Sequence, residues 1–150
     1  MFLLLIFLMK LLQAQLPFNR YPVYKGNDLG VAYTKTSSQF RIWSPPAQSA
    51  QLILYKEGEG GQPFKTINLK KGQSGTWFTS VEGDQKGMFY TFRIRFNNKW
   101  NNEVPDPYAK AAGVNGKRAM VINLKETDPS GWANEKSPAF SLLGPAVKKS

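Results

Sequence analysis

The chain has 150 residues, of which 41% are hydrophobic and 13% aromatic, enough for one folded domain with a core. It contains neither cysteine nor histidine, which excludes disulfides, thiolate metal sites and serine-histidine catalysis, and we predict no metal and no cofactor. The net charge of +10 is spread along the chain without a basic helix or an RNA-recognition motif, so we predict no specific nucleic-acid binding.

The N-terminus begins with an apolar run at residues 2–9. This run is too short to span a bilayer, which takes about 20 residues, but it has the length of a signal-peptide core, and Ala14 is a small residue at a plausible cleavage point. We predict that residues 1–14 are a signal peptide and that the protein is exported to the periplasm, cell surface or medium without a stable membrane anchor. A buried first strand or helix is the alternative.

Short segments of alternating or continuous apolar character follow, separated by turns rich in glycine and proline. We predict about seven strands, at residues 29–33, 39–43, 51–56, 64–69, 76–81, 88–96 and 119–124. This spacing is typical of an all-β, immunoglobulin-like antiparallel sandwich, which we place at residues 17–128, with residues 129–150 as a linker. A partly open oligonucleotide-binding barrel and a jelly roll are the alternatives.

Tryptophans are the candidates for binding a ligand. Trp100 lies in a predicted exposed turn at residues 97–103, beside Lys99, Asn98 and Asn101. Flat aromatic rings stack on the apolar faces of sugars and amides bind the hydroxyls, so these four residues form a candidate carbohydrate site. A hairpin tip that docks on a neighbouring domain fits the same turn equally, and plain surface exposure is a third alternative. Trp77 is a further candidate, although its place inside a strand also fits packing in the core.

A second group of residues suggests contact with another domain. Asp106 precedes a proline, which favours a turn, and we expect Tyr108 to anchor the crossover to the last strand. Trp132 stands at the start of the predicted linker, where it can pack against the sandwich. We take Asp106, Tyr108 and Trp132 as candidates for docking a neighbouring domain.

Three stretches resemble the N-terminal module of type I pullulanases, members of glycoside hydrolase family 13. They are residues 40–55, 75–94 and 103–132, within a resemblance that runs from Tyr21 to Pro138. The FRIWSP signature at residues 40–45 is shared with branching and debranching enzymes, whereas DPYAKA and VNGKR within residues 106–118 are more specific to pullulanases. The resemblance implies an early-set, immunoglobulin-like carbohydrate-binding module of family 48.

In that family a (β/α)₈ barrel follows the module and carries the nucleophilic aspartate and the acid/base glutamate. No residue of this chain matches either carboxylate, so no catalytic role is carried over. The chain is expected to be a truncated product or a stand-alone module, while the parent enzyme would hydrolyse α-1,6-glucosidic bonds by a retaining mechanism.

Three hypotheses follow for the module itself. The first is weak binding of an α-glucan such as pullulan, amylopectin or glycogen, beside docking onto a catalytic barrel. The second is a purely structural module that docks on a partner domain without binding sugar. The third, suggested by the charge, is an oligonucleotide-binding barrel.

Overall fold

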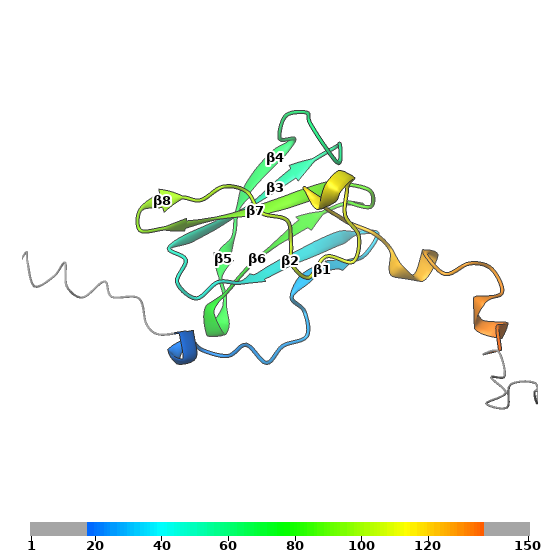
Figure 1. Ribbon diagram of the computed structural model, residues 1–150, viewed down its shortest axis with the longest axis horizontal. Helices are drawn as coiled ribbons and strands as arrows, with labels where there is room; N and C mark the ends of the chain where they lie inside the picture. The colour runs from blue at the N-terminus through cyan, green and yellow to red at the C-terminus, as the bar shows by residue number, and fades with distance from the viewer. Residues whose placement is uncertain (1–17, 137–150) are drawn as a thin grey trace, which may run out of the picture.

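The computed structural model describes residues 18–136, which form two antiparallel sheets packed as a sandwich (Figure 1). The first sheet contains, in spatial order, β1 (Gly30–Tyr33), β2 (Ser37–Trp43), β6 (Thr76–Glu82) and β5 (Lys70–Lys71). The second contains β4 (Lys65–Asn68), β3 (Ser49–Tyr55), β7 (Phe89–Phe96) and β8 (Lys99–Trp100), with β9 (Ala119–Met120) also paired to β7.

The predicted immunoglobulin-like sandwich is confirmed: the described strands pair within two separate sheets and not in the partly open barrel considered as an alternative. Five single 3₁₀ turns complete the described residues: η1 (Phe18–Arg20), η2 (Gln73–Gly75), η3 (Val114–Gly116), η4 (Leu124–Glu126) and η5 (Trp132–Asn134). The predicted signal peptide lies outside residues 18–136, and none of the described helices is long and apolar enough to cross a bilayer.

Strand alternation places the core between the sheets. Successive side chains of a strand point to opposite faces, so Phe40 on β2, Leu52 on β3 and Tyr90 on β7 all face inward and are fully buried. The register pairs Leu52 with Phe92, and Gln51 with Arg93 on the opposite face. One face of β3 and β7 therefore belongs to the core and the other to the surface.

The chain changes sheets within one residue between β4 and β5. β4 pairs with β3 in the second sheet, whereas β5 pairs with β6 in the first. Leu69, between them, is buried and donates its backbone N–H to Ala50 O at 2.9 Å. The predicted turn at residues 70–75 is therefore partly wrong, because Lys70 and Lys71 form an edge strand before η2.

The crossover from β8 to β9 is anchored by a buried carboxylate. Tyr90 packs edge-on against Phe40 and Phe92, with ring centroids 5.0 and 5.7 Å away. Its hydroxyl donates to Asp106 Oδ2 at 2.7 Å, and the Tyr108 backbone N–H donates to Asp106 Oδ1 at 2.8 Å. Burial raises the pKa of Asp106 despite these two hydrogen bonds, and burial beside Asp106 also raises the pKa of Tyr90.

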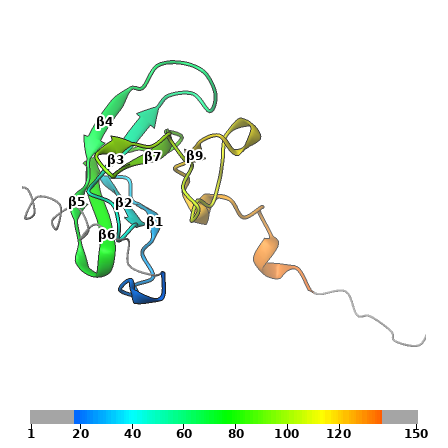
Figure 2. The ribbon, with the colours of Figure 1, turned by 60° about the vertical axis from the view of Figure 1, so that its left-hand side comes forward.

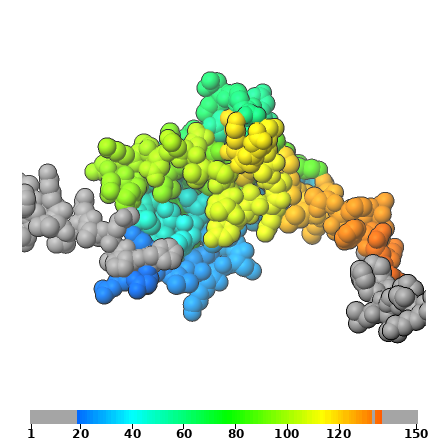
Figure 3. All heavy atoms as spheres, viewed as in Figure 1, coloured from blue at the N-terminus to red at the C-terminus, as the bar shows by residue number. Residues whose placement is uncertain are grey.

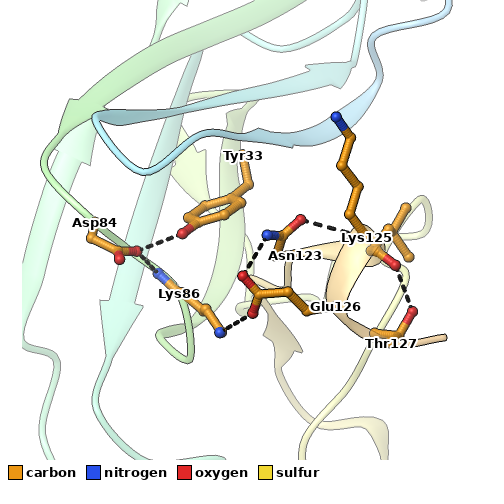
Figure 4. Close-up of polar contacts among 8 residues, drawn as sticks. Tyr33, Asp84, Lys86, Asn123, Lys125, Glu126 and Thr127 are labelled. Carbon is orange, nitrogen blue, oxygen red and sulfur yellow. Dashed lines mark hydrogen bonds and ion pairs between the residues drawn. The ribbon is translucent and has the colours of Figure 1, made fainter. Parts of the chain in front are cut away.

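The segment after β9 leaves the sandwich at one side (Figure 2) but is held at its start by a polar cluster. As Figure 4 shows, Asp84 accepts the Tyr33 hydroxyl and the Lys86 backbone N–H, each at 2.9 Å. Lys86 pairs with Glu126, which also accepts Asn123 Nδ2 at 2.8 Å. The cluster thus joins β1, the turn between β6 and β7, and η4.

We expect Asp106→Ala to lower the free energy of unfolding by about 1–3 kcal/mol, because the buried Tyr90 hydroxyl loses its acceptor.

Asp106→Asn keeps an acceptor but cannot ionise. Because the folded-state pKa of Asp106 is raised, the stability of the native protein relative to Asp106→Asn is greatest below the ordinary aspartate pKa of about 4 and declines as pH rises through the raised value. Urea unfolding between pH 4 and 8 measures both effects; a difference independent of pH would contradict the assignment.

The cluster at η4 has the opposite pH dependence. Hydrogen bonds lower the pKa of Asp84, chiefly from the Lys86 backbone N–H, and that of Glu126, chiefly from the Lys86 side chain. Their contribution is present above the ordinary carboxyl range and is lost as pH falls through the lowered values.

We expect acid and Lys86→Gln each to lower the hydrogen-exchange protection factors of the amides in residues 123–127 relative to those of β7. A protection factor is already corrected for the intrinsic exchange rate at each pH. Lys125→Gln is the matched control because its side chain extends away from the cluster (Figure 4). Equal exchange in the two variants would show that the Lys86–Glu126 pair does not hold the segment.

Candidate functional site

The β7–β8 hairpin places Trp100 on the surface of the second sheet. Its two turn residues, Asn97 and Asn98, have φ of 49° and 61°, the left-handed conformation that a two-residue hairpin turn requires and asparagine tolerates. Strand pairing resumes at once, with Lys99 opposite Phe96 and Trp100 opposite Arg95. The predicted turn at residues 97–103 is therefore shorter than expected, because Trp100 is a strand residue, but Trp100 is exposed as predicted, at 40%, beside the outward face of β7.

Polar side chains form a row across this outward face. Gln51 Nε2 on β3 donates to Asn68 Oδ1 on β4 at 2.7 Å, and Arg93 Nε on β7 donates to Gln51 Oε1 at 2.7 Å. The Arg93 guanidinium carbon then lies 5.1 Å from the centroid of the Trp100 ring. Asn68, Gln51, Arg93 and Trp100, which we call the polar row, thus connect four adjacent strands.

A carboxylate stiffens the surface next to this row. Glu103 Oε2 accepts the hydroxyls of Tyr55 and Thr91, each at 2.6 Å. The Arg118 guanidinium lies 3.4 Å from the centre of the Tyr55 ring. Burial, followed by the hydrogen bond to Glu103, raises the pKa of Tyr55, so its hydroxyl remains a donor at neutral pH.

The structure separates the other residues predicted around Trp100. Asn98 occupies the hairpin turn, where its backbone N–H donates to Gln48 Oε1 at 2.8 Å. Lys99 is exposed but pairs with Phe96, so it lies on the opposite face of β8 from Trp100. Asn101 donates its N–H to Ile94 O and lines a groove at the side of the sandwich. Only Trp100 of the predicted set belongs to the polar row.

The suggestion that Trp77 binds sugar is contradicted by its burial. Only 7% of Trp77 is exposed, it packs in the core, and its indole N–H donates to Ser44 O at 3.1 Å. Its register partner on β2 is Ile42, another inward-facing residue. Trp77 therefore supports the sandwich and offers no surface to a ligand.

A second surface feature is a pair of adjoining hollows that share Trp43 and Tyr108. The first, of ≈ 210 Å³, opens between the sheets beside Ile94, Val104 and Pro107. The second, of ≈ 320 Å³, lies against the N-terminal segment at Val23 and Leu29. Figure 3 shows this segment, in blue, below the yellow-green crossover on the same face of the molecule. We call the two hollows together the side groove.

Hydrogen bonds and an ion pair hold the chain segments beside the side groove. Trp43 Nε1 donates to Pro22 O at 3.1 Å and to Ser74 O at 2.9 Å, so the indole joins the N-terminal segment to η2. Arg41 Nε lies 2.9 Å from Asp28 Oδ2. The hydrogen bond from Tyr24, aided by the charge of Arg41, lowers the pKa of Asp28 and keeps this pair ionised.

The three predicted docking residues differ in their surroundings. Tyr108 is 44% exposed on the side groove, so the expectation that its ring anchors the crossover was wrong; buried Asp106 is the anchor instead. Because Asp106 is buried, it acts on the groove only by positioning Tyr108. Trp132 is 60% exposed and belongs to η5, a turn that lies away from both sheets in Figure 1.

Sequence reasoning missed three members of the outward face: Gln51, Asn68 and Glu103. Strand alternation could have identified Gln51, because Gln51 lies on the same face of β3 as Ile53 and Tyr55. Asn68 and Glu103 depend on inter-strand register and could not be assigned from one strand. Among residues 18–136, no three histidine, cysteine, aspartate or glutamate side chains are grouped to hold a metal.

Comparison with known proteins gives the family. Residues 28–109 match carbohydrate-binding module 48, described as the isoamylase N-terminal domain. Pullulanase from Bacillus subtilis is 36% identical over 109 residues, 71% of this chain and 15% of that protein. The chloroplastic pullulanase 1 of Arabidopsis thaliana is 26% identical over 121 residues, 75% of this chain and 12% of that protein.

Solved pullulanases share the fold as well as the sequence. The Paenibacillus barengoltzii enzyme, crystallised with maltohexaose and α-cyclodextrin, is 40% identical, with a TM-score of 0.77 over 83% of this chain and 19% of that one. The Bacillus acidopullulyticus enzyme is 37% identical, with a TM-score of 0.73 over 78% of this chain and 14% of that one. The chain therefore spans less than a fifth of the relatives' length, and it belongs to the carbohydrate-binding module 48 family in the form that pullulanases carry.

Proposed function

We propose that the outward face of the second sheet binds α-glucan, with Trp100 as the stacking platform. The polar row carries this proposal, because it places an exposed aromatic ring at the end of a line of amide and guanidinium groups on a rigid sheet. Sugar rings stack on aromatic faces, while amides donate to and accept from hydroxyls and guanidinium groups donate to them. The Paenibacillus barengoltzii complex with maltohexaose supports the choice of an α-1,4-linked glucan.

The geometry favours a glucan lying across the strands. Four adjacent strands, at ~4.8 Å between neighbours, carry Asn68, Gln51, Arg93 and Trp100 in that order. The mutual hydrogen bonds hold the side chains in place before a ligand arrives, which lowers the conformational entropy lost on binding. With one exposed tryptophan on an open face, binding is expected to be weak.

A second candidate function is docking of a catalytic barrel on the side groove. The groove carries three exposed apolar residues, Val23, Val104 and Tyr108, of which Val23 is 74% exposed. A patch of this kind is typical of a surface that contacts another domain.

In the relatives the matched region is a small part of a longer enzyme, so we propose that the parent is a pullulanase-type hydrolase of α-1,6-glucosidic bonds.

We expect Trp100→Ala to weaken glucan binding by roughly ten-fold, the effect of about 1.4 kcal/mol lost with the stacked ring. Affinity electrophoresis of the 150-residue chain in gels with pullulan, amylopectin or glycogen measures this. Trp132→Ala is the matched control, since Trp132 is exposed outside the sheet. Unchanged retardation of Trp100→Ala would exclude Trp100 as the platform, and no retardation of the native chain in any glucan would contradict sugar binding.

Docking makes a separate prediction. The double variant Val104→Ser/Tyr108→Ser should bind a catalytic region from the Paenibacillus barengoltzii pullulanase, freed of its own module, at least about ten-fold more weakly than the native chain, because apolar burial is lost. Val114→Ser, an exposed valine on η3, is the control. Sedimentation or calorimetry would detect the association. Equal affinities of the native and double-variant chains would remove the groove from the interface.

A further inference from the structure

The charges on the outward face of the second sheet are not balanced. Three guanidinium groups lie on this face, Arg93, Arg95 and Arg118, and Glu103 is the carboxylate that bonds to its strands. The ion pairs found within residues 18–136 are Arg41–Asp28, Lys86–Glu126 and Lys117–Glu59, and none of them involves this face. A face that recognises only neutral hydroxyls gains little from this excess of positive charge.

The uncompensated charge is greatest at the aromatic end of the row. Arg95 is exposed and is the cross-strand partner of Trp100. Among residues 18–136, the three ion pairs do not include its guanidinium, whereas its backbone carbonyl accepts the Gln48 N–H at 2.8 Å. Arg93 uses its Nε for Gln51, which leaves its terminal nitrogens for a ligand. Glu103, the carboxylate on this face, already accepts the hydroxyls of Tyr55 and Thr91.

We infer that this face prefers α-glucan that carries phosphate esters, with Arg95 and the terminal nitrogens of Arg93 as the phosphate site. Arginine is suited to this role because its planar fork of donors matches phosphate oxygens and always carries its charge. A glucosyl unit stacked on Trp100 would carry its ester beside both guanidinium groups. The inference rests on the proposed glucan binding and adds the class of glucan.

The test compares maltoheptaose with maltoheptaose bearing one phosphate monoester, by calorimetry on the 150-residue chain. We expect the ester to bind roughly three- to ten-fold more tightly at 0.15 M salt, a modest gain because the site is exposed. The gain should shrink at 1 M salt, where the screening length falls from ~8 to ~3 Å.

Variants locate the phosphate. Arg95→Gln should bring the affinity ratio of ester to neutral sugar toward one, and Arg95→Lys should restore part of it. Lys71→Gln, an exposed cation on β5 of the other sheet, should leave the ratio unchanged. Thermal unfolding of each variant verifies that it is folded.

The outcomes separate the two levels of the proposal. Equal affinity for both sugars in the native chain would overturn the preference for phosphate while leaving glucan binding intact. A preference that survives in Arg95→Gln would place the phosphate elsewhere and overturn the assigned site. Absence of binding to either sugar would overturn both the preference and the proposed function.

Discussion

The hydrogen bond between Tyr90 and Asp106 connects the core to the crossover that borders the outward face of the second sheet and the side groove. Tyr90 is fully buried among aromatic rings, so its hydroxyl needs a partner within the protein. Asp106 supplies that partner and fixes the crossover after β8. Along this crossover Asp106 lies between Glu103, on the outward face of the sheet, and Tyr108, on the side groove, and it binds the Tyr108 backbone N–H directly.

The two surfaces are chemically different because they lie on different parts of the sandwich. The outward face of β4, β3, β7 and β8 carries polar, mutually bonded side chains around one tryptophan. The side groove is apolar and lies where the sheets separate, with Trp43 and Tyr108 between its two hollows. Because the two surfaces are separate, the proposed glucan binding and the proposed docking would not compete.

Much of the fold was predictable because strand alternation is a local property. The apolar parity of β7 placed Tyr90 and Phe92 in the core correctly. Alternation failed where the choice of partner strand decides the outcome, as for Lys70 and Lys71, which join the other sheet. For Trp77 the sequence left both core packing and ligand binding open, because a tryptophan on a strand has the same sequence signal whether its face is inside or outside, and its burial decides for the core.

The sequence by itself determined the class of fold and the family resemblance and indicated Trp100 as a candidate, since these depend on periodicity and on residue types close together in the chain. Only the tertiary structure decided which residues accompany Trp100. Gln51 and Asn68 lie on other strands, and they meet Arg93 through the register of three strands that are distant in sequence. Register depends on the packing of the whole sheet, and no single segment of the chain encodes it.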